Sequence, residues 1–288
     1  MTSRFTSDNH PFATPESVNA LPSKPADVRL AYGPAHPQFG ELRLPSGRGP
    51  HPTAVVFHGG CWLSLYADLH NANALADALR DEGIATWNVE YRCVDQEGGG
   101  WPGTLLDAGR ATDHLRTLAS DYDLDLNRVI TIGHSAGGHL ALWTAARHRL
   151  PKSSPVWTAD PLRLRGTVVL GGPGDLKAFS LHADAECRQG VVTELLGGPG
   201  VSLERMEERF RCGSPVELLP LGLRQVMIST EHDWVVPPEL GAAYTEAARE
   251  AGDDIEHLAI PGAGHHEFMV PGSVTWPSVI TSVRSLLS

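Results

Sequence analysis

The sequence feature that most constrains this chain is a serine between two glycines, in the segment Gly133-His134-Ser135-Ala136-Gly137. An apolar run, 129–132, precedes it, and a stretch with helical character, 138–143, follows it. A strand, a sharp G-x-S-x-G turn and a helix in this order are typical of a nucleophile elbow. The glycines are needed because larger side chains would meet the neighbouring strand and helix. We therefore predict that Ser135 lies on a strained turn beside the positive end of a helix, rather than in an incidental glycine-rich turn.

Segments with strand character alternate with segments with helix character along the rest of the chain. Strands are expected at 29–32, 41–44, 53–57, 84–89, 129–132, 166–170, 225–229 and 255–260, and helices at 72–79, 104–118, 239–251 and 275–287. The first two strands form an opening hairpin, and the later alternation indicates parallel strands joined by helical crossovers. We predict a single α/β domain over 1–288 with a doubly wound, mostly parallel sheet.

Two segments depart from this alternation. Residues 1–25 are polar and contain several prolines, so we expect an N-terminal arm on the surface. Between the strands at 166–170 and 225–229 lie roughly fifty residues, more than a plain crossover needs. Helix-like pieces occur there at 191–196 and 204–210. We interpret 172–220 as a cap-like insertion over the carboxyl edge of the sheet.

Charge and hydropathy exclude several classes of partner. The formal net charge is −11 and the chain has no run rich in lysine and arginine. Nucleic acid and anionic membrane surfaces both require a basic footprint, so neither is expected as a partner. The chain also lacks an apolar stretch long enough to span a membrane. Its first residues contain no apolar core of a signal peptide, which predicts a cytoplasmic protein.

The four cysteines, Cys61, Cys93, Cys187 and Cys212, are scattered and form no C-x-x-C pair. Without a secretion signal, free thiols are the expected state. Cys187 and Cys212 fall in the same inserted region, and their spacing leaves open whether they are neighbours.

Side chains that could activate Ser135 follow later strands. Asp233 stands after the strand at 225–229, and His265 after the strand at 255–260. A serine hydroxyl needs a base to remove its proton, and the base needs a carboxylate to hold its tautomer. Sites of α/β folds lie at strand ends, and the order nucleophile, acid, base accompanies this kind of elbow. Ser135, Asp233 and His265 are therefore the predicted catalytic residues.

Neighbouring residues compete for two of these roles. Three further carboxylates are candidates for the acid: Glu231, Asp175 and Glu267. The D-x-x-V-P pattern that begins at Asp233 favours Asp233. His265 and His266 are adjacent, so their side chains point in different directions and only one can reach Ser135. We choose His265, which directly follows Gly264, and expect His266 in the wall of the substrate pocket.

A second glycine-rich loop follows the strand at 53–57, in the segment His58-Gly59-Gly60-Cys61-Trp62. Glycine lets a backbone approach a substrate oxygen closely, and such a loop supplies N–H groups to the oxyanion of a tetrahedral intermediate. We predict an oxyanion hole formed by the N–H groups of Gly60, Cys61 and Ala136. Cys61 acts there through its backbone rather than as a second nucleophile.

Two tryptophans are weaker candidates for substrate contacts. Trp62 could line the pocket or fill the core, and Trp101 follows a flexible glycine run on the same side. A metal site is the other interpretation of a chain with 14 histidines. No H-x-H or H-E-x-x-H spacing supports one, so we predict neither a metal nor a cofactor.

Taken as a set, these motifs resemble the α/β-hydrolase superfamily from about residue 27 to the C-terminus. Within it, the chain is similar to the esterase/lipase branch that includes small feruloyl and acetyl esterases, arylformamidases and the catalytic domain of prolyl oligopeptidases. The resemblance implies Ser135 as nucleophile, Asp233 as acid and His265 as base. Hormone-sensitive-lipase relatives usually have HGGG and GDSAGG, whereas Cys61 and His134 occupy those places here. This departure favours the formamidase-like members.

We therefore expect a serine hydrolase that cleaves small carboxylic esters through an acyl-enzyme. The first alternative is hydrolysis of an activated amide, such as an N-formyl aryl amine, by the same residues. The second is a non-catalytic small-molecule receptor on a hydrolase scaffold, which the presence of all three triad residues disfavours. The expected partner is a small ester or amide, and formation of a homo-oligomer is left open.

Overall fold

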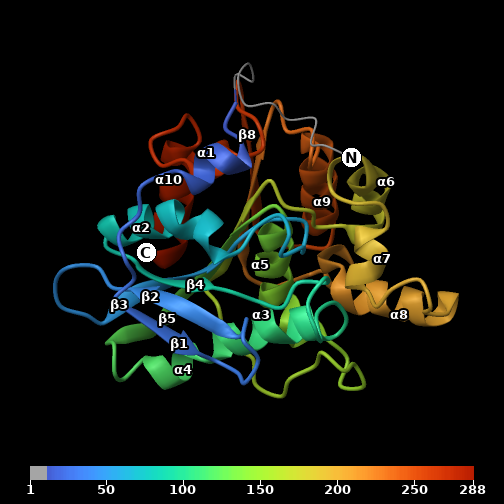
Figure 1. Cartoon of the computed structure of the whole chain (residues 1–288), viewed down its shortest axis with the longest axis horizontal. Helices are drawn as coiled ribbons and strands as arrows, with labels where there is room; N and C mark the ends of the chain where they lie inside the picture. The colour runs from blue at the N-terminus through green and yellow to red at the C-terminus, as the bar shows by residue number, and fades with distance from the viewer. Residues whose placement is uncertain (1–11) are drawn as a thin grey trace.

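A computed structural model describes residues 12–288, except for the side chains of residues 184–186 (Figure 1). The described part contains an eight-stranded sheet in the order β1-β2-β4-β3-β5-β6-β7-β8. The strands are β1 (Val28–Ala31), β2 (Phe39–Arg43), β3 (His51–Phe57), β4 (Ala85–Val89), β5 (Leu124–His134), β6 (Gly166–Leu170), β7 (Arg224–Thr230) and β8 (Ile255–Ile260). Only β2 runs against its neighbours, β1 and β4. The other pairs are parallel, which confirms the predicted α/β-hydrolase fold.

Helices cover both faces of the sheet. They are α1 (Pro15–Asn19), α2 (Asn73–Asp81), α3 (Gly103–Asp113), α4 (Leu115–Leu118), α5 (Ala136–Ala146), α6 (Leu176–Glu186), α7 (Val191–Leu195), α8 (Leu203–Gly213), α9 (Pro238–Glu250) and α10 (Trp276–Leu287). Short 3₁₀ turns are η1 (Leu69–Ala72), η2 (Arg147–Arg149), η3 (Pro215–Leu218) and η4 (Glu267–Met269). Within residues 12–288, no helix has the length and apolar character needed to cross a membrane.

The core consists of one apolar layer on each side of the sheet. Because side chains alternate along a strand, Val55 and Phe57 of β3 join the layer beneath α3, α5 and α9. Ala54 and Val56 join the opposite layer, beneath α2 and α10. Burial on both faces explains why the central strands are continuous apolar runs rather than alternating ones.

The expected elements are present, with two differences. The helix predicted over 104–118 is divided into α3 and α4 by a turn at His114. Helix α6 was not predicted, although Asp175 is a helix-start signal: its Oδ1 accepts hydrogen bonds from the N–H groups of Lys177 and Ala178.

The long connection between β6 and β7 folds into α6, α7, α8 and η3. Helices α6, α7 and α8 follow one another down one side of the molecule in Figure 1. The connection is fastened to α5 by two hydrogen bonds. His139 Nε2 donates to the carbonyl of Gly213, and Trp143 Nε1 donates to the carbonyl of Cys212, each at 2.8 Å. Because α5 starts at the predicted elbow, these bonds bring the predicted cap segment, 172–220, close to the predicted site.

The N-terminal arm is described from Phe12 onward, and the rest of the predicted 1–25 arm lies outside the described residues. The Phe12 ring lies 5.2 Å from the ring of His232. The backbone N–H of Ala13 donates to Glu267 Oε1 at 2.6 Å. The arm therefore packs against the loops that follow β7 and β8, which carry Asp233 and His265.

Candidate active site

The turn at Ser135 has the strained geometry that the motif predicts. Its φ and ψ are 53° and −122°, between the end of β5 and the start of α5. A Cβ at Gly133 would lie 2.1 Å from the carbonyl oxygen of Gly137, and one at Gly137 would lie 2.1 Å from that of Phe57. Both contacts are with backbone, which cannot move aside, so only glycine fits at these positions. The strain at a non-glycine residue points to a functional turn.

His265 and Asp233 form a buried pair. His265 Nδ1 and Asp233 Oδ2 are 2.7 Å apart, and each residue is at most 4% exposed. The other carboxylate oxygen, Oδ1, accepts the N–H groups of Val235 at 3.0 Å and Val236 at 2.8 Å. These bonds hold the carboxylate in place, and the carboxylate in turn holds the His265 ring with Nδ1–H directed toward it.

The three competing carboxylates each have another partner. Asp175 caps α6, and Glu231 accepts the backbone N–H of Gly262 at 2.9 Å. Glu267 accepts the N–H of Gly264 at 2.9 Å in addition to that of the arm. Among the described residues, none of these three carboxylates hydrogen-bonds to His265, so the geometry favours Asp233 as the acid.

The elbow is bonded to the loop that carries His265, but by the side chain of His134 and not by the hydroxyl of Ser135. His134 Nε2 donates to the carbonyl of His265 at 2.8 Å, and the two rings lie 4.5 Å apart. Within residues 12–288 the Ser135 hydroxyl makes no hydrogen bond in this structure. Catalytic hydrogen bonds commonly tighten only when substrate binds.

Neutral imidazoles surround His265. Burial, together with the proximity of His265 and His266, lowers the pKa of His134 well below its ordinary value. Burial and then the charge of His265 lower the pKa of the half-buried His266 to about 3. Both neighbours are uncharged in neutral solution, so an imidazolium that forms at His265 meets no like charge from them.

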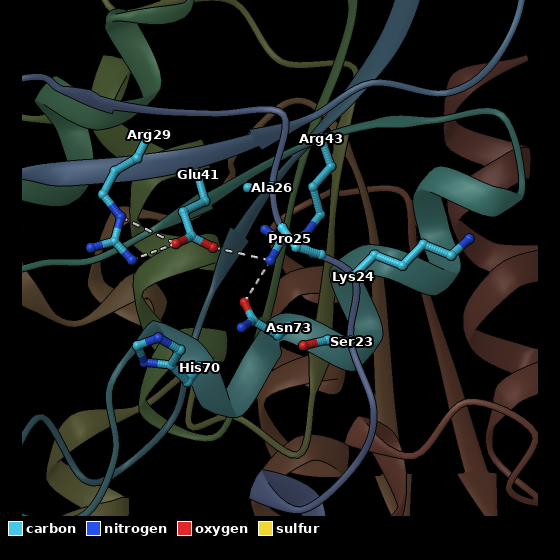
Figure 2. A pocket seen from close by; sticks show the side chains of 9 residues that line it. All are labelled: Ser23, Lys24, Pro25, Ala26, Arg29, Glu41, Arg43, His70 and Asn73. Carbon is cyan, nitrogen blue, oxygen red and sulfur yellow. Dashed lines mark hydrogen bonds and ion pairs between the residues drawn. The ribbon is translucent and has the colours of Figure 1, made fainter.

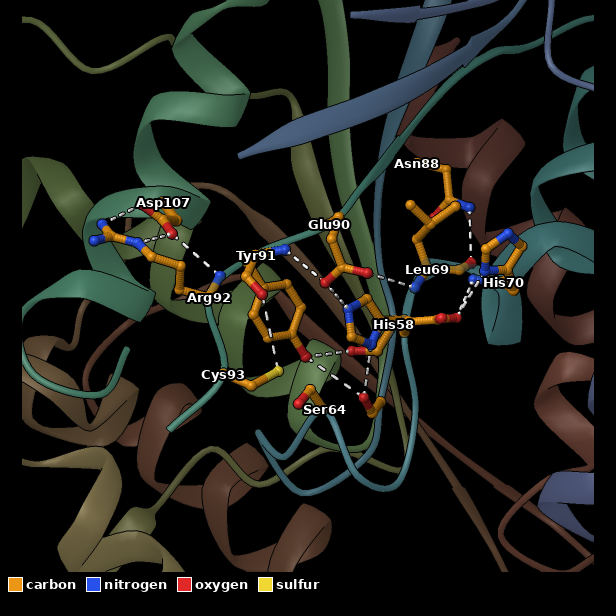
Figure 3. A network of polar contacts seen from close by, with 12 residues as sticks. His58, Ser64, Leu69, His70, Asn88, Glu90, Tyr91, Arg92, Cys93 and Asp107 are labelled. Atoms are coloured by element: carbon orange, nitrogen blue, oxygen red, sulfur yellow. Dashed lines mark hydrogen bonds and ion pairs between the residues drawn. The ribbon is translucent and has the colours of Figure 1, made fainter. Parts of the chain in front are cut away.

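The glycine-rich loop after β3 lies directly over the elbow. A Cβ at Gly59 would be 3.2 Å from the Cβ of Ser135. Two carbonyls of the loop have hydrogen-bond partners within the protein, one of which is His58 (Figure 3). His58 Nδ1 donates to the Gly59 carbonyl at 2.8 Å, and the Leu63 N–H donates to the Gly60 carbonyl at 2.8 Å.

These carbonyl contacts orient the next N–H groups. In a trans peptide the C=O and the following N–H point in opposite directions, so fixing the Gly59 and Gly60 carbonyls directs the N–H groups of Gly60 and Cys61 the other way. Among the described residues, neither N–H has a hydrogen-bond acceptor. Ala136 is the first residue of α5, where N–H groups have no partner within the helix. The three predicted oxyanion donors are thus available to a ligand.

A buried ion pair supports this loop from below. His58 Nε2 and Glu90 Oε1 are 3.0 Å apart, and the His58 ring stacks on Tyr91 (Figure 3). A backbone carbonyl and a carboxylate can only accept, so His58 satisfies both partners as the doubly protonated imidazolium. Burial alone lowers the pKa of His58, but the Glu90 carboxylate raises it above its ordinary value. Sequence reasoning missed this pair, although Glu90 directly follows β4, at the same edge of the sheet.

The two tryptophans occupy different environments. Trp62 is fully buried, and its ring packs edge-on against His139 and Phe179. This position favours its alternative role as a core residue over a role in the pocket wall. Trp101 is half-buried and lies beneath the guanidinium of Arg209 on α8, 5.6 Å from the ring centre.

The prediction of free thiols is wrong for two of the four cysteines. Cys61 and Cys187 form a disulfide across 126 residues of sequence. Cys93 and Cys212 are buried and free, so Cys187 does not pair with Cys212. Sequence spacing could not reveal the bond, because it depends on the end of α6 folding back onto the loop after β3.

A second region, a groove at the β1–β2 edge of the sheet, is also lined by charged side chains (Figure 2). Three of its charged side chains pair with one another: the Glu41 carboxylate accepts from Arg29 at 2.6 Å and from Arg43 at 3.0 Å. Among the described residues that line it, none belongs to the predicted catalytic set. This groove is therefore separate from the candidate site around Ser135.

The sequence matches the family model described as BD-FAE over residues 41–247. The chain belongs to the BD-FAE family. This match runs from within β2 to within α9 and includes the elbow, the glycine-rich loop and Asp233, whereas His265 lies beyond it. The family assignment agrees with the esterase/lipase resemblance of the motifs.

Two curated relatives illustrate the similarity. Esterase LipC of Mycobacterium tuberculosis is 24% identical over 80% of this chain and 56% of its own length. The probable isoprenylcysteine alpha-carbonyl methylesterase ICMEL2 of Arabidopsis thaliana is 26% identical over 84% of this chain and 57% of its own. The chain thus spans little more than half the length of these relatives.

Solved structures share the fold. A truncated form of a carbohydrate esterase from gut microbiota superposes with a TM-score of 0.75 at 18% identity, covering 91% of this chain and 98% of that one. A bacterial heroin esterase gives a TM-score of 0.67 at 20% identity, covering 87% and 80%. At these identities the likeness establishes the fold.

Proposed function

We propose that this protein is a serine hydrolase that cleaves small carboxylic esters through an acyl-enzyme intermediate. The observation that carries the proposal is the 2.7 Å contact between His265 Nδ1 and Asp233 Oδ2, beside an elbow that holds Ser135 at a φ of 53°. Three curated relatives, LipC, ICMEL2 and a versiconal hemiacetal acetate esterase, are named as esterases, which supports ester over amide cleavage.

In the proposed acylation step, Ser135 Oγ attacks the ester carbonyl carbon while His265 Nε2 takes the hydroxyl proton. Asp233 keeps the His265 ring in the required tautomer and stabilises the imidazolium. The carbonyl oxygen becomes an oxyanion, which accepts hydrogen bonds from the loop and elbow N–H groups. Removing one such donor typically lowers the rate about a hundredfold or more. Collapse of the intermediate expels the alcohol, which receives the proton from His265.

Deacylation repeats these steps with water as the nucleophile. His265 removes a proton from water, hydroxide attacks the acyl carbon, and Ser135 leaves with the proton returned by His265. The uncharged state of His134 and His266 favours both steps, because the transient imidazolium at His265 faces no added positive charge from them.

The substrate is proposed to be small. Ser135 is only 4% exposed, and the 172–220 insertion packs on the helix that begins at the elbow. A short acyl group on an aromatic or alkyl alcohol suits such restricted access, whereas a long lipid chain needs a large apolar rim.

The test is covalent labelling combined with turnover. The purified protein should hydrolyse p-nitrophenyl acetate, and a fluorophosphonate should label Ser135 alone. Ser135→Ala should lose both properties while its circular dichroism spectrum and melting temperature stay close to wild type. Labelling at another residue, or an active Ser135→Ala protein, would overturn the proposal. Faster turnover of N-formylkynurenine than of any aryl ester would instead favour the arylformamidase alternative.

A further inference from the structure

The disulfide connects two parts of the proposed site that sequence places far apart. Cys61 belongs to the loop over Ser135, and Cys187 is the C-cap of α6, with their Cα atoms 5.8 Å apart. The carbonyl of Cys187 also accepts a hydrogen bond from the Tyr66 hydroxyl at 3.0 Å. One covalent bond and one hydrogen bond thus join the end of α6 to the loop.

Helix α6 also meets this loop through an apolar contact. The ring of Phe179 packs edge-on against the buried ring of Trp62, with 6.0 Å between ring centres. Eight residues of sequence separate this contact from Cys187, about 12 Å along a helix at 1.5 Å per residue. The loop is therefore held to α6 at two separate points, the contact between Trp62 and Phe179 and the disulfide between Cys61 and Cys187.

The loop backbone requires such support. Cys61 and Trp62 have φ values of 52° and 56°, in the left-handed region that residues with a Cβ seldom adopt. Two successive residues in this region persist only when surrounding contacts hold them there. Breaking the disulfide removes a restraint at Cys61, whose N–H is one of the proposed oxyanion donors.

We propose that Cys187 is a positioning residue for the oxyanion hole, and that reduction of its bond to Cys61 slows the reaction without unfolding the enzyme. This inference rests on the proposed hydrolase function. In this proposal the disulfide joins the 172–220 insertion to the loop after β3 and also fixes the direction of the Cys61 N–H. Since transition states depend on that direction more than bound substrates do, the effect falls on kcat rather than on KM.

The reduction itself is an ordinary thiol–disulfide exchange with a dithiol as reductant. A dithiol thiolate attacks Sγ of Cys187, which belongs to a half-buried residue, and the Cys61 thiolate leaves. The second thiol of the reagent then attacks the mixed disulfide and releases Cys187. Two electrons pass to the enzyme cysteines, which become thiols, and the reagent becomes a cyclic disulfide.

The test compares oxidised and dithiothreitol-treated enzyme with p-nitrophenyl acetate as substrate. We expect kcat to fall about tenfold or more on reduction, as a displaced oxyanion donor predicts, with KM changed less than about threefold. Reoxidation with oxidised glutathione should restore kcat. Circular dichroism of the reduced enzyme should retain the wild-type spectrum at the assay temperature.

Two variants make the test specific. Cys187→Ser should have the low kcat of reduced enzyme and should not respond to dithiothreitol. Cys212→Ala, which changes a buried free cysteine of the same insertion, should respond as wild type does. If Cys187→Ser does not fold, the comparison of reduced and oxidised wild type still decides.

The outcomes separate this inference from the proposed function. Equal kcat in both redox states, with Ser135 labelled by a fluorophosphonate in both, would overturn the positioning role and leave the hydrolase assignment intact. An oxidised enzyme that is neither labelled nor active would overturn both. A drop in kcat that Cys212→Ala abolishes, or one that Cys187→Ser fails to reproduce, would also contradict the role of Cys187.

Discussion

The His58 imidazole and the Glu90 carboxylate form a buried pair, with 3.0 Å between Nε2 and Oε1, beneath the loop that carries the proposed oxyanion donors. The pair joins the ends of two adjacent parallel strands, β3 and β4. His58 also holds the Gly59 carbonyl. The charge state of one imidazole is thereby linked to both the stability and the shape of the site.

The first prediction concerns stability as a function of pH. The folded-state pKa of His58 is raised, so the folded protein binds more protons than the unfolded chain in the interval above the ordinary histidine pKa of about 6.5. The contribution of the pair is fully present below that value and is lost as pH rises through the higher folded pKa. Histidines with a lowered folded-state pKa, such as His134 and His266, have the opposite effect on wild-type stability, so the decline due to His58 is measured as a difference between wild type and a variant without the pair, by denaturant unfolding from pH 6 to 9.

The control for that prediction is Glu90→Gln, which removes the charge that raises the pKa of His58. It should destabilise the protein by about 3 kcal/mol or more at pH 6, because it leaves a buried partner uncompensated. The difference in unfolding free energy between wild type and Glu90→Gln should shrink as pH rises from 6 to 9, because the histidines with lowered pKa values affect both proteins alike. Parallel curves for variant and wild type would exclude a charged His58.

The second prediction separates two adjacent histidines. His265→Ala should lower kcat by roughly three orders of magnitude or more, since it removes the base of the proposed triad. His266→Ala should alter mainly KM or substrate preference. Because the pKa of His266 is about 3, its loss should leave the pH–rate profile above pH 5 unchanged. Reversed results would make His266 the base.

The third prediction concerns the acid. Asp233→Asn should keep the geometry but favour the wrong tautomer of His265, lowering kcat by about four orders of magnitude. Glu231→Gln is the matched control, because its carboxylate is exposed and bonds to the loop backbone at Gly262. It should change kcat less than about threefold. A small loss of kcat on substitution of Asp233, with a large loss on substitution of Glu231 or Asp175, would identify that other residue as the acid.

The fourth prediction concerns acyl length. Activity on p-nitrophenyl esters should be highest from acetyl to butyryl and fall steeply by octanoyl, because access to Ser135 is restricted. The rate should not increase when the substrate is presented as an emulsified triglyceride, which means that interfacial activation is not expected. A profile that rises toward decanoyl esters would instead identify a lipase-like groove.

The sequence by itself determined the features that depend on local geometry. A strand, two obligatory glycines and a helix place Ser135 on its elbow, because the steric limits arise within a few residues of the turn. The contact between Asp233 and His265 also followed from sequence. Both residues stand just after successive strands, β7 and β8, that pair in parallel and end at the same edge.

Only the tertiary structure decided which distant segments meet. The strand order brings β4 beside β3, and with it Glu90 to His58, although the two residues lie in separate crossovers. The bond between Cys61 and Cys187 depends on how the 172–220 insertion turns back over the sheet edge. The burial of Trp62 depends on the same insertion, through Phe179. Contacts of this kind arise from the packing of whole elements, and no local pattern of residues records how those elements pack.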